Sequence, residues 1–185
     1  GECGPEQARL DECRRPEDFQ HNEVQLKDVR IHYVREGSGP PLVLLHGWPG
    51  FWWEWHKVIG PLAESYDVIV PDHRGFGDSE KIDLDNVSNY SAEALMSDVA
   101  PFLDALGLDK VYLVGHDWGA IVAHKFLRKH PERIVKAAIF DPITPSYGAS
   151  SAHYVEEDWY FLFHQLDMAL SLVSLNRDTR RLYYK

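Results

Sequence analysis

The sequence predicts an α/β fold built on a mostly parallel, doubly wound sheet. Short apolar runs suited to buried strands alternate along the chain with segments of helical periodicity, which is the pattern of that architecture. The chain has 185 residues, of which 44% are hydrophobic, so it is long enough to bury a substantial core. We therefore expect one core domain with a six-stranded sheet.

Each expected strand is a run of apolar or β-branched residues bounded by turn residues. Residues 23–27 and 30–34, joined by a tight connection, are expected to form an antiparallel edge pair. The parallel strands are expected at residues 41–45, 66–71, 111–114 and 134–140. Residues 1–20 are expected to form an N-terminal lead and residues 21–142 the core.

Helices are expected between the parallel strands. Residues 52–63 form the first, interrupted near Gly60-Pro61, because proline breaks helical hydrogen bonding. Ser91 is expected to cap the second, residues 92–106, whose apolar stripe recurs at helical spacing and belongs in the core. The third covers residues 120–128.

The most informative motif is Gly115-His116-Asp117-Trp118-Gly119, at the junction of a strand and a helix. It has the form of a nucleophile elbow, a sharp turn that lifts its central side chain clear of the sheet, with aspartate in place of the usual serine. A serine needs a base to remove its proton, whereas a carboxylate with an ordinary pKa of about 3.9 is already ionised at neutral pH. Asp117 is therefore expected to attack an electrophilic sp³ carbon, forming an alkyl-enzyme ester that water later hydrolyses. Epoxides and alkyl halides are the natural substrates.

By itself, Gly-x-Asp-x-Gly is as readily interpreted as an ordinary turn, since Asp and Gly are common turn residues. A second motif favours the catalytic interpretation, because the strand at 41–45 runs directly into His46-Gly47-Trp48-Pro49-Gly50. The backbone N–H groups of Trp48 and Trp118 would then form an oxyanion hole beside Asp117. The neighbouring histidines, His46 and His116, are expected to be hydrogen-bonded structural residues.

Composition and spacing argue against several other classes of function. A formal net charge of −10 without a basic run disfavours nucleic acid or an anionic membrane as partner. No apolar stretch reaches the roughly 18 to 20 residues of a membrane span, and Cys3 and Cys13 imply no disulfide framework. The glycines of residues 72–79 lack the rest of a phosphate loop, so this segment is expected to be a structural loop at the rim of the site. Since neither membrane anchoring nor secretion is signalled, we expect a cytoplasmic protein. The histidines lack metal-ligand spacing, so we expect neither a metal nor a cofactor.

In combination these motifs resemble those of the bacterial soluble epoxide hydrolases of the α/β-hydrolase fold, close to the type that opens epichlorohydrin. The similarity covers residues 14–19, 46–55, 72–79, 159–160 and 164–168. It implies that Asp117 is the nucleophile, that the amides of Trp48 and Trp118 form the oxyanion hole, and that Tyr160 of a helical cap assists the epoxide oxygen. Trp48, Pro49 and Trp118 would contact a small apolar epoxide, with water as second substrate.

The resemblance also implies parts that this sequence lacks. In α/β-hydrolases the acid and the histidine of the triad follow the nucleophile after further strands. We therefore expect the N-terminal part of a longer enzyme, with residues 143–185 as the beginning of a helical cap domain. Such a chain would be impaired in turnover, and its exposed sheet edge would favour self-association.

Two alternatives remain open at this point. One is a haloalkane-type dehalogenase, in which the same aspartate displaces halide and the indoles of Trp48 and Trp118 bind the leaving group. Tyr160 favours the epoxide, because a developing alkoxide needs a proton that a halide does not. The other alternative is a non-catalytic fragment or binding module that keeps only the apolar pocket.

Overall fold

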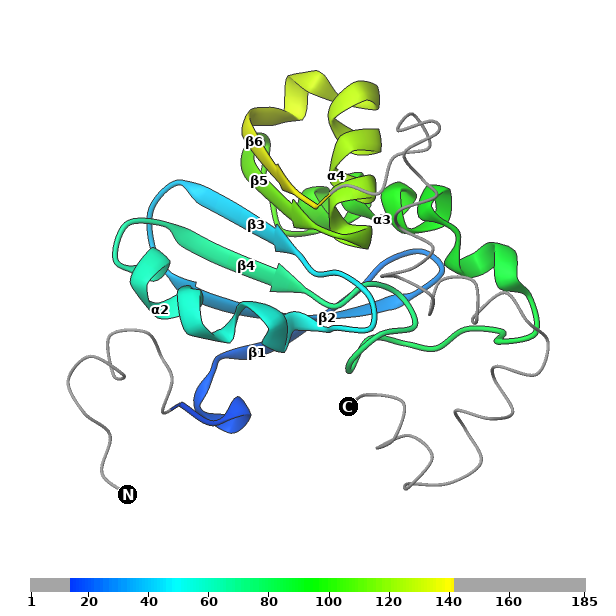
Figure 1. Ribbon diagram of the computed structural model, residues 1–185, viewed down its shortest axis with the longest axis horizontal. Helices are drawn as coiled ribbons and strands as arrows, with labels where there is room; N and C mark the ends of the chain where they lie inside the picture. Colours follow the sequence, from blue (N-terminus) through cyan, green and yellow to red (C-terminus); the bar gives the residue numbers. More distant parts are fainter. Residues whose placement is uncertain (1–13, 142–185) are drawn as a thin grey trace, which may run out of the picture. The chain divides into compact units, whose positions relative to one another are not determined.

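The computed structural model describes residues 14–141. Their six strands form one sheet in the order β1-β2-β4-β3-β5-β6 (Figure 1). The chain divides into two compact units, Gly1–Ile143 and Thr144–Lys185, and the whole of the second lies outside the described residues. The expected start of a cap at 143–185, including Tyr160, therefore lies outside them too.

The sheet has an antiparallel edge and a parallel remainder, as the sequence predicts. Its strands are β1 (His21–Gln25), β2 (Arg30–Gly37), β3 (Pro41–Leu45), β4 (Asp67–Pro71), β5 (Val111–His116) and β6 (Ile134–Phe140). β2 is antiparallel to both β1 and β4, whereas β3 pairs in parallel with β4 and β5, and β5 in parallel with β6. All six expected strands are confirmed, with small shifts at their ends.

Three α-helices connect the strands, and the predicted Ser91 cap is confirmed. They are α2 (His56–Ala63), α3 (Ala92–Ala105) and α4 (Trp118–Lys129), with short 3-10 helices η1 (Pro16–Asp18), η2 (Trp52–Trp55), η3 (Val87–Tyr90) and η4 (Pro131–Arg133). Ser91 Oγ accepts a hydrogen bond from the Ala94 amide at 3.2 Å. Within residues 14–141, no helix combines the length and the apolar character needed to span a membrane.

The expected interruption near Gly60-Pro61 is wrong. The irregularity lies earlier, where the 3-10 helix η2 ends at Trp55 and α2 begins at His56. α2 runs through Pro61, which lies in the last turn of an eight-residue helix. The missing N–H of Pro61 removes one backbone hydrogen bond to the preceding turn, but the helix is not broken there.

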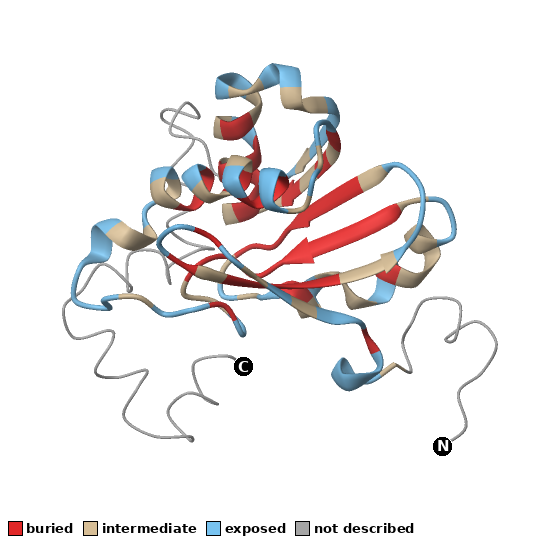
Figure 2. Cartoon of the chain, turned by 180° about the vertical axis from the view of Figure 1, so that it is seen from behind, coloured by how far each residue is buried: buried red, intermediate tan, exposed pale blue. Residues whose placement is uncertain are grey.

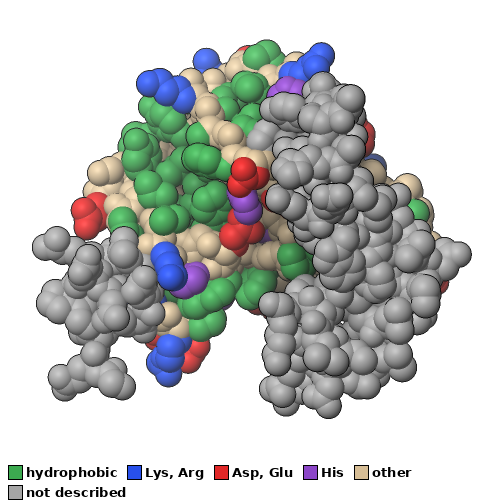
Figure 3. Space-filling view, viewed as in Figure 1, with side chains coloured by type: hydrophobic (Ala, Val, Ile, Leu, Met, Phe, Trp, Pro, Cys, Tyr) green, Lys and Arg blue, Asp and Glu red, His purple; other side chains and the backbone are tan. Residues whose placement is uncertain are grey.

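The helices cover both faces of the sheet and divide its core into two clusters. Because side chains alternate along a strand, Val43 and Leu45 of β3 pack with α3 and α4, whereas Leu42 and Leu44 pack with Ile59 of α2. The central strands are buried along most of their length (Figure 2). β6 lies at the edge of the described sheet, and most of its residues are exposed. Apolar side chains gather on the face of the molecule shown in Figure 3.

The register of the parallel strands determines where the functional loops meet. Leu45 at the end of β3 is paired with Gly115 of β5, and Gly115 with Ile139 of β6. Because parallel strands end at the same edge of a sheet, the segment after Leu45 and the turn after Gly115 emerge next to each other. The fold thus brings residues 46–50 to the elbow at residues 115–119.

Candidate active site

Asp117 lies at the junction of β5 and α4, as the sequence predicts. Its backbone has φ 52° and ψ −115°, a conformation that costs a residue with a side chain about 1–3 kcal/mol. Three backbone hydrogen bonds hold it there. The Asp117 amide donates to the Phe140 carbonyl at 3.2 Å, and the Asp117 carbonyl accepts from the amides of Ala120 at 3.0 Å and Ile121 at 3.2 Å.

The glycines on either side of Asp117 allow the chain to turn this sharply. A Cβ on Gly115 would lie 2.3 Å from the Gly119 carbonyl oxygen. A Cβ on Gly119 would lie 2.2 Å from the Leu45 carbonyl oxygen, because the start of α4 packs directly against the end of β3. Both contacts are with backbone, which cannot move aside, so any side chain at either position would displace the elbow.

The loop after β3 provides a hydrogen-bond donor to the Asp117 carboxylate. The Trp48 amide donates to Asp117 Oδ1 at 2.8 Å. Gly47 makes this approach possible, since a Cβ there would lie only 2.7 Å from Asp117 Cβ. The Trp118 amide is in the first turn of α4, where N–H groups have no intrahelical acceptor and the helix dipole favours negative charge. This arrangement can orient a carboxylate and stabilise an oxyanion that develops on it.

The other predicted site residues within residues 14–141 differ in burial. Trp48 and Trp118 are partly buried, and Pro49, joined to Trp48 by a cis peptide bond, is exposed. Their contact with a substrate remains a prediction. Tyr160 lies outside the described residues.

Sequence reasoning did not single out Glu54, although the structure places it between the two loops of the site. Glu54 Oε2 accepts a hydrogen bond from the Gly47 amide at 2.9 Å, and Oε1 lies 2.6 Å from Nδ1 of His116. His116 is thus hydrogen-bonded, as predicted, and its Nε2 also lies 3.6 Å from Asp141 Oδ2. The available signal was a single carboxylate within the aromatic run Phe51-Trp52-Trp53-Glu54-Trp55.

Residues 72–79 form a loop that is exposed at Gly77 and Asp78 and buried or half-buried elsewhere, and its position at the rim of the site remains a prediction. Asp72 is fully buried, and His73, Arg74 and Ser79 are at most 9% exposed. The Asp72 carboxylate accepts from the Trp52 amide at 2.7 Å and from the Asp78 amide at 3.0 Å. A buried carboxylate without hydrogen-bond donors would be costly. Asp72 can be buried because several donors bind both of its carboxylate oxygens.

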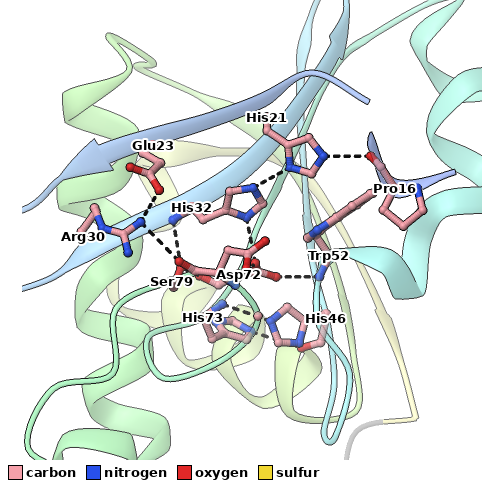
Figure 4. A network of polar contacts seen from close by, with 12 residues as sticks. Pro16, His21, Glu23, Arg30, His32, His46, Trp52, Asp72, His73 and Ser79 are labelled. Carbon is pink, nitrogen blue, oxygen red and sulfur yellow. Dashed lines mark hydrogen bonds and ion pairs between the residues drawn. The ribbon is translucent and has the colours of Figure 1, made fainter. Parts of the chain in front are cut away.

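A chain of histidines completes the hydrogen bonding of Asp72 (Figure 4). His32 Nδ1 lies 2.8 Å from Asp72 Oδ2, His32 Nε2 lies 2.8 Å from His21 Nδ1, and His21 Nε2 lies 2.8 Å from the Pro16 carbonyl oxygen. Carbonyl and carboxylate oxygens only accept, so both outer ring nitrogens must donate. The contacts of the two rings thus connect the buried Asp72 carboxylate to Pro16 of η1.

His46 and His73 form a second buried pair below the loop after β3. The His73 amide donates to His46 Nε2 at 3.0 Å, and His46 Nδ1 lies 2.8 Å from the Gly47 carbonyl oxygen. Burial lowers the pKa of His46, and it lowers the pKa of His73 well below the usual range. Both ring nitrogens of His46 are occupied, which agrees with the structural role expected for it.

The structure also assembles a group that sequence spacing did not indicate. Ligand atoms of His32, Asp72 and Asp78 lie within 4.8 Å of one another. Two of these groups already bond to each other, since His32 Nδ1 lies 2.8 Å from Asp72 Oδ2. A hydrogen bond therefore accounts for the close approach of His32 and Asp72.

Comparisons with known proteins agree with this geometry. The alpha/beta hydrolase fold family matches residues 40–180, and the family described as epoxide hydrolase N terminus matches residues 10–55. The soluble epoxide hydrolase of Corynebacterium sp. (strain C12) is 44% identical over 123 residues, covering 66% of this chain and 42% of that protein. The fluoroacetate dehalogenase of Burkholderia sp is 34% identical over 173 residues, covering 88% of this chain and 55% of that protein.

A solved structure gives the same result. The epoxide hydrolase VrEH1 from Vigna radiata superposes with a TM-score of 0.73 at 30% identity, covering 90% of this chain and 56% of that one. The chain thus spans about half the length of these relatives. Sheet order, elbow and adjoining loop occur together over the matched residues, and the chain belongs to the α/β hydrolase fold family.

Proposed function

We propose that the complete protein opens epoxides to vicinal diols through an alkyl-enzyme ester on Asp117. The observation that carries this proposal is the 2.8 Å hydrogen bond from the Trp48 amide to Asp117 Oδ1, on a side chain held at a strained elbow. The match of residues 10–55 to the epoxide hydrolase N terminus supports the epoxide as substrate class, as does the 44% identity to the Corynebacterium enzyme.

In the first step the two carboxylate oxygens of Asp117 have different tasks. Oδ1 is held by the Trp48 amide, which leaves Oδ2 to attack an epoxide carbon. A bond forms between Oδ2 and that carbon while the carbon–oxygen bond of the ring breaks, and the ring oxygen becomes an alkoxide. Tyr160 donates a proton to it, since a phenol with an ordinary pKa near 10 can protonate the more basic alkoxide.

In the second step water attacks Cγ of the Asp117 ester. The ester carbonyl oxygen is then Oδ1, and negative charge develops on it in the tetrahedral intermediate. The Trp48 amide already points at this oxygen, and the Trp118 amide is the second donor of the proposed oxyanion hole. Collapse of the intermediate breaks the bond between Cγ and the ester oxygen and restores the carboxylate. Of the two protons of the water, one goes to the oxygen of the released diol and the other returns to the Tyr160 phenolate.

The indole of Trp118 and the segment Trp48-Pro49 are proposed to contact a small apolar epoxide, because pockets for such molecules are lined by aromatic side chains. A dehalogenase is the second candidate. The specific support for it is the 34% identity to the fluoroacetate dehalogenase over 88% of this chain. Both reactions begin with the same attack by Asp117, so they differ in the leaving group and in the need for Tyr160.

One experiment tests the nucleophile and the route together. The complete protein, in excess over a reactive epoxide, is allowed one turnover in water enriched in heavy oxygen. Because water attacks Cγ, the heavy atom should enter the Asp117-containing peptide, while the diol receives its oxygen from Asp117. Heavy oxygen found only in the diol would show direct attack by water and would overturn the proposal.

The matched control variants are Asp117→Asn and Asp85→Asn. Asn tolerates positive φ almost as well as Asp, so the first variant should keep the fold but form no ester. Asp85 is exposed on a loop, and its variant should react like the wild type. Release of fluoride from fluoroacetate at a rate above diol formation would favour the dehalogenase instead.

A further inference from the structure

We propose that Glu54 is a positioning residue that holds the proposed oxyanion loop (residues 46–50) against the elbow at residues 115–119. This inference rests on the proposed function and adds a residue to it. Glu54 lies in η2, and its side chain is 24% exposed. Its carboxylate oxygens are hydrogen-bonded to Gly47 and His116, so we expect its effect on Asp117 to pass through these two partners.

Those partners belong to the two segments whose separation must stay fixed, residues 46–50 and residues 115–119. Oε2 accepts from the Gly47 amide at 2.9 Å, and Oε1 lies 2.6 Å from Nδ1 of His116. An ionised carboxylate only accepts, so Nδ1 of His116 is the donor and both oxygens of Glu54 are in use. The packing leaves room for this side chain, because a Cβ on Gly50 would lie 2.6 Å from Glu54 Oε2.

The two bonds act on the immediate neighbours of the reacting groups. Gly47 directly precedes Trp48, so consecutive amides of one loop donate to the carboxylates of Glu54 and Asp117, at 2.9 Å and 2.8 Å. His116 directly precedes Asp117. One carboxylate therefore connects the peptide before the oxyanion donor to the residue before the nucleophile, and fixes the separation of the two.

The support for Glu54 is itself rigid. Trp52, two residues earlier in η2, is 1% exposed and packs edge-on against Phe19 with ring centroids 5.1 Å apart. Its amide donates to the fully buried Asp72 at 2.7 Å. A positioning residue needs a rigid support. η2 provides this support, because its Trp52 belongs to the buried network of Figure 4.

The two chemical steps should respond differently to the loss of Glu54. In the attack on the epoxide, the carboxylate of Asp117 loses charge, so a bond to Oδ1 helps the ground state at least as much as the transition state. In ester hydrolysis, Oδ1 gains charge, and the Trp48 amide counts most in the transition state. Misplacing that amide should therefore slow hydrolysis far more than ester formation.

Single-turnover kinetics of the complete protein with a reactive epoxide, followed by intact mass, separates the two steps. We expect Glu54→Ala to slow ester hydrolysis about 10- to 100-fold and ester formation by less than about threefold, so that the alkyl-enzyme accumulates. Glu54→Gln should recover most of the hydrolysis rate, because its amide oxygen can still accept from the Gly47 amide. Glu64→Ala removes an exposed glutamate of the same segment and should behave like the wild type.

A variant that merely unfolds would lose both steps in the same proportion, which thermal denaturation would also reveal. If Glu54→Ala does not fold, Glu54→Asp keeps the charge but is one methylene too short to reach both partners, and the same expectation applies to it. A wild type that alkylates Asp117 and turns over, with equal or no effect of the Glu54 variants on the two steps, overturns the positioning role alone. A wild type that forms no adduct on Asp117 overturns the proposed function as well.

Discussion

Adding one methyl group at Gly47 should separate the proposed oxyanion loop from Asp117, the proposed nucleophile. A Cβ at this position would lie 2.7 Å from Asp117 Cβ and 2.9 Å from Oδ1. For the contact between the two Cβ atoms to reach an ordinary distance of 3.4 Å, the loop and the elbow must move apart by about 0.7 Å. The distance from the Trp48 amide nitrogen to Asp117 Oδ1 would then grow from 2.8 Å to about 3.5 Å, beyond the range of a hydrogen bond.

The size of the effect follows from the lost donor. Removing one oxyanion-hole donor typically lowers kcat by about 10²–10³. Because the loop of Gly47→Ala is displaced but the Trp48 amide is retained, we expect a loss of about 10². Overpacking a tight contact costs about 1–3 kcal/mol of unfolding free energy, so we expect the Gly47→Ala variant still to fold.

Diol formation by the complete protein and its thermal midpoint would be measured for Gly47→Ala and for a control. Gly107→Ala adds the same methyl group at a position where no atom lies within 4 Å but φ is +70°. It should lose about 1 kcal/mol of stability through backbone strain and keep its kcat. A Gly47→Ala protein with kcat within about threefold of the wild type would refute the reasoning, as would an equal loss of kcat in Gly107→Ala.

Three further predictions concern stability. Asp117→Gly should be more stable than Asp117→Ala by about 1–2 kcal/mol in urea denaturation, since both lose the carboxylate but only alanine keeps the strain at φ 52°; equal stabilities would argue against strain. Asp72→Asn should cost about 3 kcal/mol, because the amide cannot accept from all the buried donors, including the Trp52 amide, and a loss below about 1 kcal/mol would contradict this. Burial lowers the pKa of His73, so its contribution to stability is complete above the ordinary pKa of about 6.5 and is lost as the pH falls through the lowered value. His73→Gln should therefore flatten the fall in unfolding free energy between about pH 6.5 and 5, and an unchanged slope would show that His73 is not buried in its neutral form.

Local patterns predicted most of the fold. Hydrophobic runs located the six strands, Ser91 located the start of α3, and the glycines of the elbow placed Asp117 between a strand and a helix. These features depend on residues close together in the sequence. The interruption expected near Pro61 is wrong, and a local pattern does not show that the helix continues for only two more residues.

The long-range polar contacts could not be predicted in the same way. Asp72 and Glu54 are charged, and charged residues are usually exposed. What buries Asp72 is a set of donors far away in the chain, at His32 and Trp52, and what engages Glu54 is a histidine 62 residues later. Hydrophobic periodicity does not predict such partners, since they come into contact only when the sheet has formed. Tyr160 remains a prediction from the resemblance alone.

The strain at Asp117 explains why the site draws on so many distant segments. The conformation costs about 1–3 kcal/mol, and a single net hydrogen bond returns only about 1 kcal/mol. Four hydrogen bonds oppose the cost: one to Phe140 of β6, two from the first turn of α4, and one from the loop after β3. One of these hydrogen bonds alone would not offset the upper part of this range, whereas the four together outweigh the strain. All four hydrogen bonds to Asp117 form only when β3, β5 and β6 have assembled in register.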